Sequence, residues 1–188
     1  MRKVAIVTGA SSGIGRQLCL ELAKEGYDLG LLARSQAALE TLAAEIRQLG
    51  QTAVVCPCDV SQKQSVFEAV ERVHQEFGGV DLLVANAGIG RDQSLKTFDA
   101  GQARKIYEVN VIGLMQSIAA VLPQMIQQGR GHIVGISSIA AFISFPKTYV
   151  YCASKAAVNA HLEGLRIEAK GYGIDVTTVC PGFIKTPQ

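Results

Sequence analysis

Tyr151 and Lys155 stand four residues apart in the segment YCASK. The apolar spacing around them predicts a helix over about residues 148–170, so both side chains lie on one helix face, one turn apart. A free tyrosine has a pKa of about 10 and is a poor base at neutral pH, but a neighbouring ammonium stabilises the phenolate. Such a pair can exchange a proton with a substrate. An ordinary amphipathic helix can show the same spacing, and Tyr149 lacks a lysine four residues on.

Ser138 ends the apolar run GHIVGISS, which predicts a strand over residues 131–138. The carboxyl ends of strands in open α/β sheets are where ligands bind. A hydroxyl there can hold a reacting oxygen, whereas Ser137 would point to the opposite side of a continuing strand. Asn110 lies between two valines in a predicted helix, where a buried amide is costly unless its hydrogen bonds are made.

Three glycines, Gly9, Gly13 and Gly15, follow the apolar run KVAIVT. Glycine permits the unusual backbone angles of a tight turn and lets the backbone approach a bulky anion. The N-terminus of the next helix adds free N–H groups and a partial positive charge, which suit a diphosphate. The spacing is Gly-x-x-x-Gly-x-Gly rather than the common Gly-x-Gly-x-x-Gly. A tight turn without any ligand would also use glycine.

These residues need elements that bring them together, and strand-like apolar runs alternate with helical patterns along the chain. That alternation is typical of a parallel sheet with helices on both faces, and so predicts a doubly wound α/β fold. The predicted strands do not alternate between apolar and polar residues but are apolar throughout, as expected where both sheet faces are buried. The predicted strands are 3–8, 27–33, 52–57, 80–88, 131–138 and 174–182. The predicted helices cover about 14–24, 36–49, 62–77, 99–128 and 148–170.

Polar residues and glycines mark the ends of these helices. Ser35 is expected to cap the second helix, and Gly50 to stop it. Ser61 with Gln64 three residues later predicts a capping box at the start of the third helix. Gly78 is expected to end that helix.

The bulk composition excludes several classes of protein. A chain of 188 residues, 48% hydrophobic and 18% charged, predicts a single globular domain over residues 1–188. The net charge is only +2 and no block of Lys or Arg is present, so we expect no nucleic-acid partner. No signal-peptide core is found, and no stretch approaches about eighteen apolar residues. We therefore expect a cytoplasmic protein without a membrane partner.

The five cysteines predict reduced, structural thiols rather than a metal site. The motif Cys56-Pro-Cys58 lacks the CxxC spacing, and no second Cys/His pair lies at zinc-finger distance. The remaining cysteines are scattered along the chain: Cys19, Cys152 and Cys180.

Several short motifs follow one another along the chain in the order that is typical of one protein family. These motifs are TGASSGIG at residues 8–15, Asp59 in CDV, NAG at 86–88, Asn110, Ser138 in GISS, Tyr151 and Lys155 in YCASK, and Pro181-Gly182 with Thr186. They resemble the motifs of the short-chain dehydrogenase/reductases, from residue 4 to residue 187. The resemblance implies a Rossmann-like sheet of strand order 3-2-1-4-5-6 and a nicotinamide cofactor. It also implies reversible hydride transfer between nicotinamide and a carbonyl or secondary alcohol of a small molecule.

The resemblance also implies a role for each catalytic residue. Tyr151 would give or take the proton while Ser138 holds the reacting oxygen. Lys155 would stabilise the tyrosinate and bond the nicotinamide ribose. Asn110 would anchor a water that links the lysine to solvent.

The same resemblance implies a set of cofactor-binding residues. Asp59 would bond the adenine, although an Asp at this place could simply satisfy nearby backbone N–H groups. Asn86 would help to hold the central strand, and Thr186 would bond the nicotinamide carboxamide. The full expected set is Gly9, Ser11, Ser12, Gly13, Ile14, Gly15, Arg34, Ser35, Asp59, Val60, Asn86, Ala87, Gly88, Tyr151, Lys155, Pro181, Gly182, Ile184 and Thr186.

The end of the second strand favours NADP(H) over NAD(H). A carboxylate at this point would repel a 2′-phosphate, whereas an arginine forms charge-assisted bonds to one. The sequence has Arg34 there, with Ser35 as a second donor. Arg34 could also be a plain surface residue. NADP-binding members of the family often carry a second basic residue inside the glycine loop, where this chain has Ser12.

Family members normally continue past the motif PGFIKTP through a substrate-covering segment, a further helix and a last strand. We therefore expect the 188 residues to lack that segment and the final strand. The remaining candidates for the substrate wall are 89–93, 139–145 and Phe183. They are largely apolar, which favours an apolar carbonyl compound, although loops packing on their own domain would look the same.

Two further expectations concern partners and alternative functions. The resemblance implies a homodimer or homotetramer through the helices of Asn110 and Tyr151. Small residues such as Ala156, Ala157 and Ala160 would permit close packing there, or could serve the sheet. The alternative functions are a cofactor-binding protein without catalysis, such as a redox sensor or inactive subunit, and a dehydratase or epimerase on the same scaffold.

Overall fold

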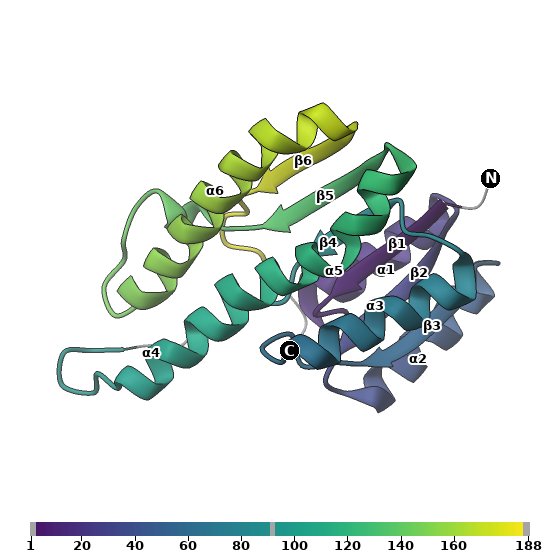
Figure 1. Cartoon of the computed structure of the whole chain (residues 1–188). Helices are drawn as coiled ribbons and strands as arrows, with labels where there is room; N and C mark the ends of the chain where they lie inside the picture. Colours follow the sequence, from purple (N-terminus) through teal and green to yellow (C-terminus); the bar gives the residue numbers. More distant parts are fainter. Residues whose placement is uncertain (1–2, 91–92, 186–188) are drawn as a thin grey trace.

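A single parallel sheet is the centre of the molecule. The computed structural model describes residues 3–90 and 93–185. Within them six parallel strands pair in the order β3-β2-β1-β4-β5-β6 (Figure 1). This confirms the predicted Rossmann-like α/β class and strand order. The strands are β1 (Lys3–Thr8), β2 (Tyr27–Ala33), β3 (Ala53–Pro57), β4 (Leu82–Ala85), β5 (Gly131–Ile136) and β6 (Ile174–Val179).

Helices cover both faces of this sheet because successive strand residues point to opposite sides. In β1, Ala5 and Val7 are buried with residues of α1 (Gly13–Lys24) and α2 (Gln36–Gln48). The intervening Val4 and Ile6 belong to the core made with α3 (Lys63–Phe77), α5 (Gly113–Gln128) and α6 (Tyr149–Ala169). Both faces are therefore apolar, as the absence of alternation in the strands predicted.

Strands β4, β5 and β6 end earlier than the sequence predicted, at Ala85, Ile136 and Val179. The last paired residues are Ala85 with Gly135 and Ile136 with Val179, and beyond them only isolated backbone bonds remain, such as that from the Ser137 N–H to the Val179 carbonyl at 2.7 Å. The segments 86–88, 137–138 and 180–182 are consequently loops. Because the strands are parallel, these loops meet at one edge of the sheet.

The helix predicted over residues 99–128 is interrupted. It consists of α4 (Ala100–Tyr107), a π-helical turn η1 (Glu108–Ile112) and then α5. Asp99 caps α4, because its carboxylate accepts a hydrogen bond of 2.8 Å from the N–H of Gly101. The short 3-10 turns η2 (Ile139–Ala141) and η3 (Lys170–Tyr172) precede and follow α6.

The helix ends agree only in part with the predicted caps. Gly78 ends α3 in the left-handed region at φ 79°, which confirms that prediction. Ser35 occupies the N-cap of α2 but its side chain makes no capping bond. The prediction of a capping box at Ser61 is wrong. Helix α3 begins at Lys63, and the Ser61 hydroxyl instead donates a hydrogen bond to Asp59.

Among the described residues, one helical run, Ala100–Gln128, is long and apolar enough to cross a membrane by length and composition. The most apolar stretch of 18 residues within it has a mean hydropathy of 1.5, and 44% of that stretch is buried in the protein. The buried part of α5 packs on the sheet together with α3. A core helix with such packing meets the same criteria of length and composition.

Candidate active site

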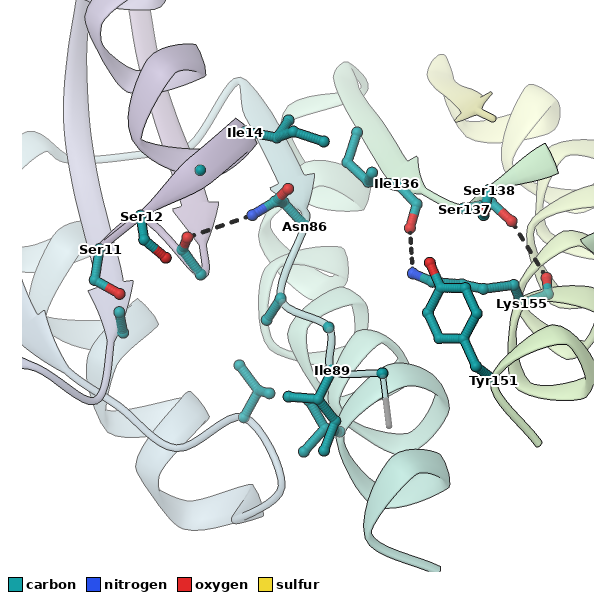
Figure 2. Close-up of a pocket in the computed structure, with 18 of the residues that line it drawn as sticks. Ser11, Ser12, Ile14, Asn86, Ile89, Ile136, Ser137, Ser138, Tyr151 and Lys155 are labelled. Carbon is teal, nitrogen blue, oxygen red and sulfur yellow. Dashed lines mark hydrogen bonds between the residues drawn. The ribbon is translucent and has the colours of Figure 1, made fainter. Parts of the chain in front are cut away.

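A cleft of about 1330 Å³ opens at the carboxyl edge of the sheet (Figure 2). Of the expected site residues, Gly15 and Asn110 lie outside the cleft lining, and Thr186 lies outside the described residues. The expected residues that line the cleft are Gly9, Ser11, Ser12, Gly13, Ile14, Arg34, Ser35, Asp59, Val60, Asn86, Ala87, Gly88, Ser138, Tyr151, Lys155, Pro181, Gly182 and Ile184.

The glycine loop between β1 and α1 needs its glycines for close backbone contacts. Gly9 has φ 68° and Gly13 has φ 54°, in the region that disfavours other residues. A Cβ on Gly9 would come within 2.9 Å of the Ala87 Cα, and one on Gly15 would overlap the Gly9 carbonyl oxygen. Gly15 therefore allows the close backbone contact with Gly9 inside the loop, whereas Gly9 and Gly13 line the cleft.

Asn86 joins the glycine loop to the end of β4. Its amide Nδ2 donates to the Thr8 carbonyl at 2.9 Å, and its backbone N–H donates to the Thr8 hydroxyl at 3.0 Å. The same Nδ2 lies 3.4 Å from the Gly9 carbonyl oxygen, to which it also donates (Figure 2). The Ala87 N–H donates to the Thr8 hydroxyl at 3.0 Å. These bonds connect the two central strands, in line with the structural role expected for Asn86.

Lys155 is buried in the wall of the cleft. Its side chain follows α6 into the protein, where Nζ donates to the Ile136 carbonyl at 2.8 Å. Burial lowers the pKa of the Lys155 ammonium to about 8, although the nearby Cys180 opposes this. The Nζ atom lies 5.8 Å from the centroid of the Tyr151 ring, so the two side chains share one helix face as predicted (Figure 2).

The two serines after β5 have different surroundings. Ser137 is buried, and its hydroxyl donates to the Lys155 carbonyl at 3.3 Å. Ser138 is half-buried, and its hydroxyl accepts a hydrogen bond of 3.1 Å from the N–H of Ala140 at the start of η2. The Ser138 hydroxyl keeps its own proton for donation, since its recorded bond uses only an acceptor lone pair.

Asn110 joins η1 to the loop after β4 and to α6. Its Oδ1 accepts from the Ile89 N–H at 2.8 Å, and its Nδ2 donates to the Ile89 carbonyl at 2.9 Å. The same Nδ2 donates to the Ser154 hydroxyl at 3.0 Å, and Ser154 donates to the Tyr151 carbonyl at 2.7 Å. The buried amide thus has its hydrogen bonds, and it positions Ile89 and the helix of Tyr151. Its role in holding a water stays a prediction.

Asp59 lies at the other end of the cleft, near Arg34 and Ser35. Its Oδ1 accepts from the Ser61 N–H at 3.0 Å and from the Ser61 hydroxyl at 2.8 Å. Burial alone would raise the pKa of Asp59, but these bonds and the charges of Arg34 and Lys105 lower it below its ordinary value. Asp59 thus makes the bond to a nearby backbone N–H that the sequence allowed for, and it also lines the cleft.

Sequence reasoning missed one face of α4 and its continuation in η1. The cleft is also lined by Gln102, Lys105 and Val109. Their spacing of three and four residues is that of one helix face, which could have been read from the sequence ahead of Asn110. Thr148, at the N-cap of α6, is a further missed lining residue.

The expected substrate wall is present only in part. Ile89 and Gly90 line the cleft, whereas residues 91–92 lie outside the described residues. The segment 139–145 does not contribute to the cleft lining. Phe183 is 93% exposed and contacts the Phe145 ring edge-on, with centroids 6.2 Å apart.

All five cysteines are unpaired in the structure, and four of them are buried. Burial raises the pKa of the Cys19 thiol to about 12 and that of Cys56 to about 11. These thiols stay protonated at neutral pH and pack as apolar groups, in agreement with the structural role expected for them.

Comparisons with known proteins place this geometry in a family. The family model described as short chain dehydrogenase matches residues 3–188. An uncharacterised oxidoreductase of Myxococcus xanthus is 39% identical over 184 residues, which cover 98% of this chain and 73% of the relative.

Two solved structures of similar fold contain nicotinamide cofactors. An alcohol dehydrogenase from Thermococcus sibiricus in complex with 5-hydroxy-NADP has a TM-score of 0.92 and 33% identity, covering 98% of this chain and 77% of that one. A short chain dehydrogenase/reductase from Burkholderia phymatum in complex with NAD has a TM-score of 0.94 and 32% identity, covering 98% and 67%. Together with the family match and the fold, these likenesses show that the chain belongs to the short-chain dehydrogenase/reductase family of oxidoreductases.

Proposed function

We propose that this protein is an NADP(H)-dependent oxidoreductase that interconverts a carbonyl and a secondary alcohol, with Tyr151 as the acid and base. The observation that carries the proposal is that Ser138, Tyr151 and Lys155 line the same cleft as the glycine loop. A proton donor, an oxygen-binding hydroxyl and a diphosphate-binding turn are the parts that a hydride-transfer enzyme has to supply.

The glycine loop fits a dinucleotide cofactor. A side chain at Gly9 would collide with the backbone after β4, so the loop can take its tight shape only without one. The loop leads into the N-terminus of α1, where free N–H groups and the helix dipole favour a diphosphate. When bound, NADP(H) would supply the hydride.

The residues of this chain supply the proton and the orientation. In reduction, the Ser138 hydroxyl donates a hydrogen bond to the substrate oxygen and holds it near Tyr151. The Tyr151 hydroxyl then transfers its proton to that oxygen as negative charge develops on it. The buried Lys155 ammonium stabilises the resulting tyrosinate by its positive charge.

The surroundings of the cleft support a small apolar substrate. Ile89 and Ile184 line it, and exposed aromatic and aliphatic side chains follow η2 and β6 in the sequence, outside the cleft lining itself. These exposed residues are Phe142, Ile143 and Phe183. We further propose that the enzyme works as a soluble protein of the cytoplasm, because the buried part of α5 packs on its own sheet.

The mechanism is tested with Tyr151→Phe. We expect turnover to fall by at least about 10²-fold, since the acid and base are lost, while NADPH still binds. Tyr149→Phe is the matched control, because Tyr149 stacks on Phe98 away from the cleft lining. The assay is NADPH oxidation with a panel of aromatic ketones, aldehydes, and 3-oxoacyl and steroid substrates. Near-normal turnover of the variant would contradict the mechanism, and cofactor binding without turnover on the whole panel would favour a cofactor-binding protein.

The cofactor preference is tested by fluorescence titration of NADPH against NADH. We expect tighter binding of NADPH, and Arg34→Leu should weaken it by about tenfold or more, because a charge-assisted hydrogen bond contributes roughly 1.5–3 kcal/mol. NADH affinity should change little. Arg47→Leu, an exposed position in the last turn of α2, is the control. A wild-type protein that prefers NADH would overturn the assignment.

A further inference from the structure

A second positive side chain faces the adenosine end of the cleft from α4. Lys105 lines the cleft together with Arg34, although the two residues come from different elements. Within the described part of the chain, neither side chain forms an ion pair within 4 Å. The adjacent Arg104, by contrast, is paired with Glu108 at 2.7 Å and is absent from the cleft lining. Arg34 and Lys105 thus keep their charges available for an anionic ligand.

The balance of charge at this end of the cleft is positive. Its lining there contains Arg34, Lys105 and a single carboxylate, Asp59. The Oδ1 of Asp59 already accepts two hydrogen bonds from Ser61. Both cations act electrostatically on this carboxylate, so both lie near the same point. One carboxylate leaves one of the two positive charges uncompensated.

The helical run that begins with α4 is held against the Asp59 loop farther along, at α5. Gln116 of α5 donates from Nε2 to the Val60 carbonyl at 2.8 Å. Gly113 packs so closely on Val60 that a Cβ there would come within 2.7 Å of its side chain. Asn110 anchors the intervening turn through Ile89. These contacts fix η1 and α5 relative to the Asp59 loop, and so limit where the Lys105 backbone can lie.

The chemistry of the cofactor explains why this position matters. The adenosine ribose of NAD(H) has no charge at its 2′ oxygen, whereas the 2′-phosphate of NADP(H) carries about −1.5 to −2 at neutral pH, like other phosphate monoesters. Arg34 can form a two-point contact with such a group. Ser12 in the glycine loop brings no charge. One further cation is needed to balance the phosphate.

We propose that Lys105 is this second cation and that it determines the specificity for the 2′-phosphate. The second positive charge would then come from α4 instead of from the glycine loop. The proposal rests on the NADP(H) preference proposed above. The Lys105 ammonium is a mobile point charge on a flexible stem, so it can reach a phosphate that Arg34 also contacts.

The test uses two probes that contain only the adenosine end of the cofactors, adenosine 2′,5′-bisphosphate and 5′-AMP. Calorimetric titration should show that Lys105→Gln weakens binding of the bisphosphate about tenfold and of 5′-AMP less than about twofold. Arg104→Gln removes the same charge from the neighbouring position and should change neither affinity. Lys105→Arg should retain the preference, and added salt should reduce the difference between wild type and Lys105→Gln.

Two results would overturn the role of Lys105. Equal weakening of both probes would mean that Lys105 contacts the adenine, and unchanged affinities would mean that it is a plain surface residue. A different result separates this inference from the proposed cofactor: wild-type protein that binds the bisphosphate no better than 5′-AMP would refute the NADP(H) preference itself. Lys105 is exposed and makes no structural bond within the described residues, so the variants should fold normally.

Discussion

At the scale of single residues, a side chain that the proposed mechanism needs can lower the stability of the fold. Lys155 is the clearest case. Its side chain is only 4% exposed and has a single recorded hydrogen-bond acceptor, the Ile136 carbonyl. Burial lowers its pKa from the ordinary 10.5 to about 8. Because one pKa unit corresponds to about 1.4 kcal/mol, keeping the ammonium charged in the folded state costs on the order of 3 kcal/mol. The proposed mechanism needs that charge beside Tyr151.

Replacing this lysine should therefore stabilise the protein while destroying activity. We expect Lys155→Met to raise the free energy of unfolding at pH 7 by roughly 1–3 kcal/mol, less than the full cost because the bond to Ile136 is lost. Between about pH 8 and 10.5 the unfolded state holds the proton that the folded wild type has released, so wild-type stability rises with pH relative to the variant.

The gain from Lys155→Met should therefore shrink over that pH interval. Urea unfolding of both proteins from pH 7 to pH 10.5 measures it, and Lys96→Met, at an exposed position, is the control. A gain that stays constant with pH, or a loss of stability at pH 7, would contradict this account.

Among the elements, the π-helical turn η1 has the most direct effect on the site. It places Asn110 in the interior between the loop after β4 and α6, where one side chain makes three hydrogen bonds to Ile89 and Ser154. Such turns occur often at functional sites, because an extra residue in the helix redirects its side chains. Here it brings the helix of Lys105, the loop of Ile89 and the helix of Tyr151 into one fixed arrangement.

Removing the Asn110 side chain should loosen that arrangement. We expect Asn110→Ala to lower the free energy of unfolding by roughly 2–4 kcal/mol, since it leaves both the N–H and the carbonyl of Ile89 without their partner. Urea denaturation measures the loss. Asn159→Ala is the matched control, because the recorded contact of Asn159 is a weak one with the Cys180 thiol at 3.8 Å. Equal losses in the two variants would show that the Asn110 bonds have no special structural role.

At the scale of the whole molecule, apolar side chains remain exposed on the long helices away from the cleft lining. Tyr107 at the end of α4 is 39% exposed, Ile112 at the end of η1 is 45% exposed, and Ile167 on α6 is 75% exposed. Small exposed residues, Ala156 and Ala160, lie on the same α6 helix. Exposed apolar side chains on helices of this kind are candidates for an interface between protein molecules. The homodimer or homotetramer expected from the sequence stays a prediction.

Light scattering on the purified protein tests this prediction. We expect a mass of two or four times the chain mass of 20.0 kDa. Ile112→Lys should shift the measured mass toward that of a single chain, because a buried unpaired charge at an interface is costly. Leu95→Lys is the control, since Leu95 is 92% exposed but lies outside these helices. A wild-type mass of 20.0 kDa would exclude the oligomer.

Much of the fold could be predicted because the signals involved are local. Apolar runs in strands, helical periodicity and glycines at helix ends depend on neighbours within a few residues, and β1, β2 and α6 appear close to their predicted bounds. The capping box at Ser61 failed because Asp59, two residues earlier, competes for the same hydroxyl. The end of β5 at Ile136 depends on where β4 and β6 stop, which no local pattern reports.

The α/β class, the helix face shared by Tyr151 and Lys155, and the residue types proposed to hold a diphosphate and move a proton could all be predicted from the order and spacing of residues in the chain. The contacts of Asn110 with Ile89 and Ser154, and the cleft that Lys105 shares with Arg34, emerged only from the folded structure. Those contacts join residues far apart in the chain, and burial and hydrogen-bond geometry select them only once the sheet has brought its loops to one edge.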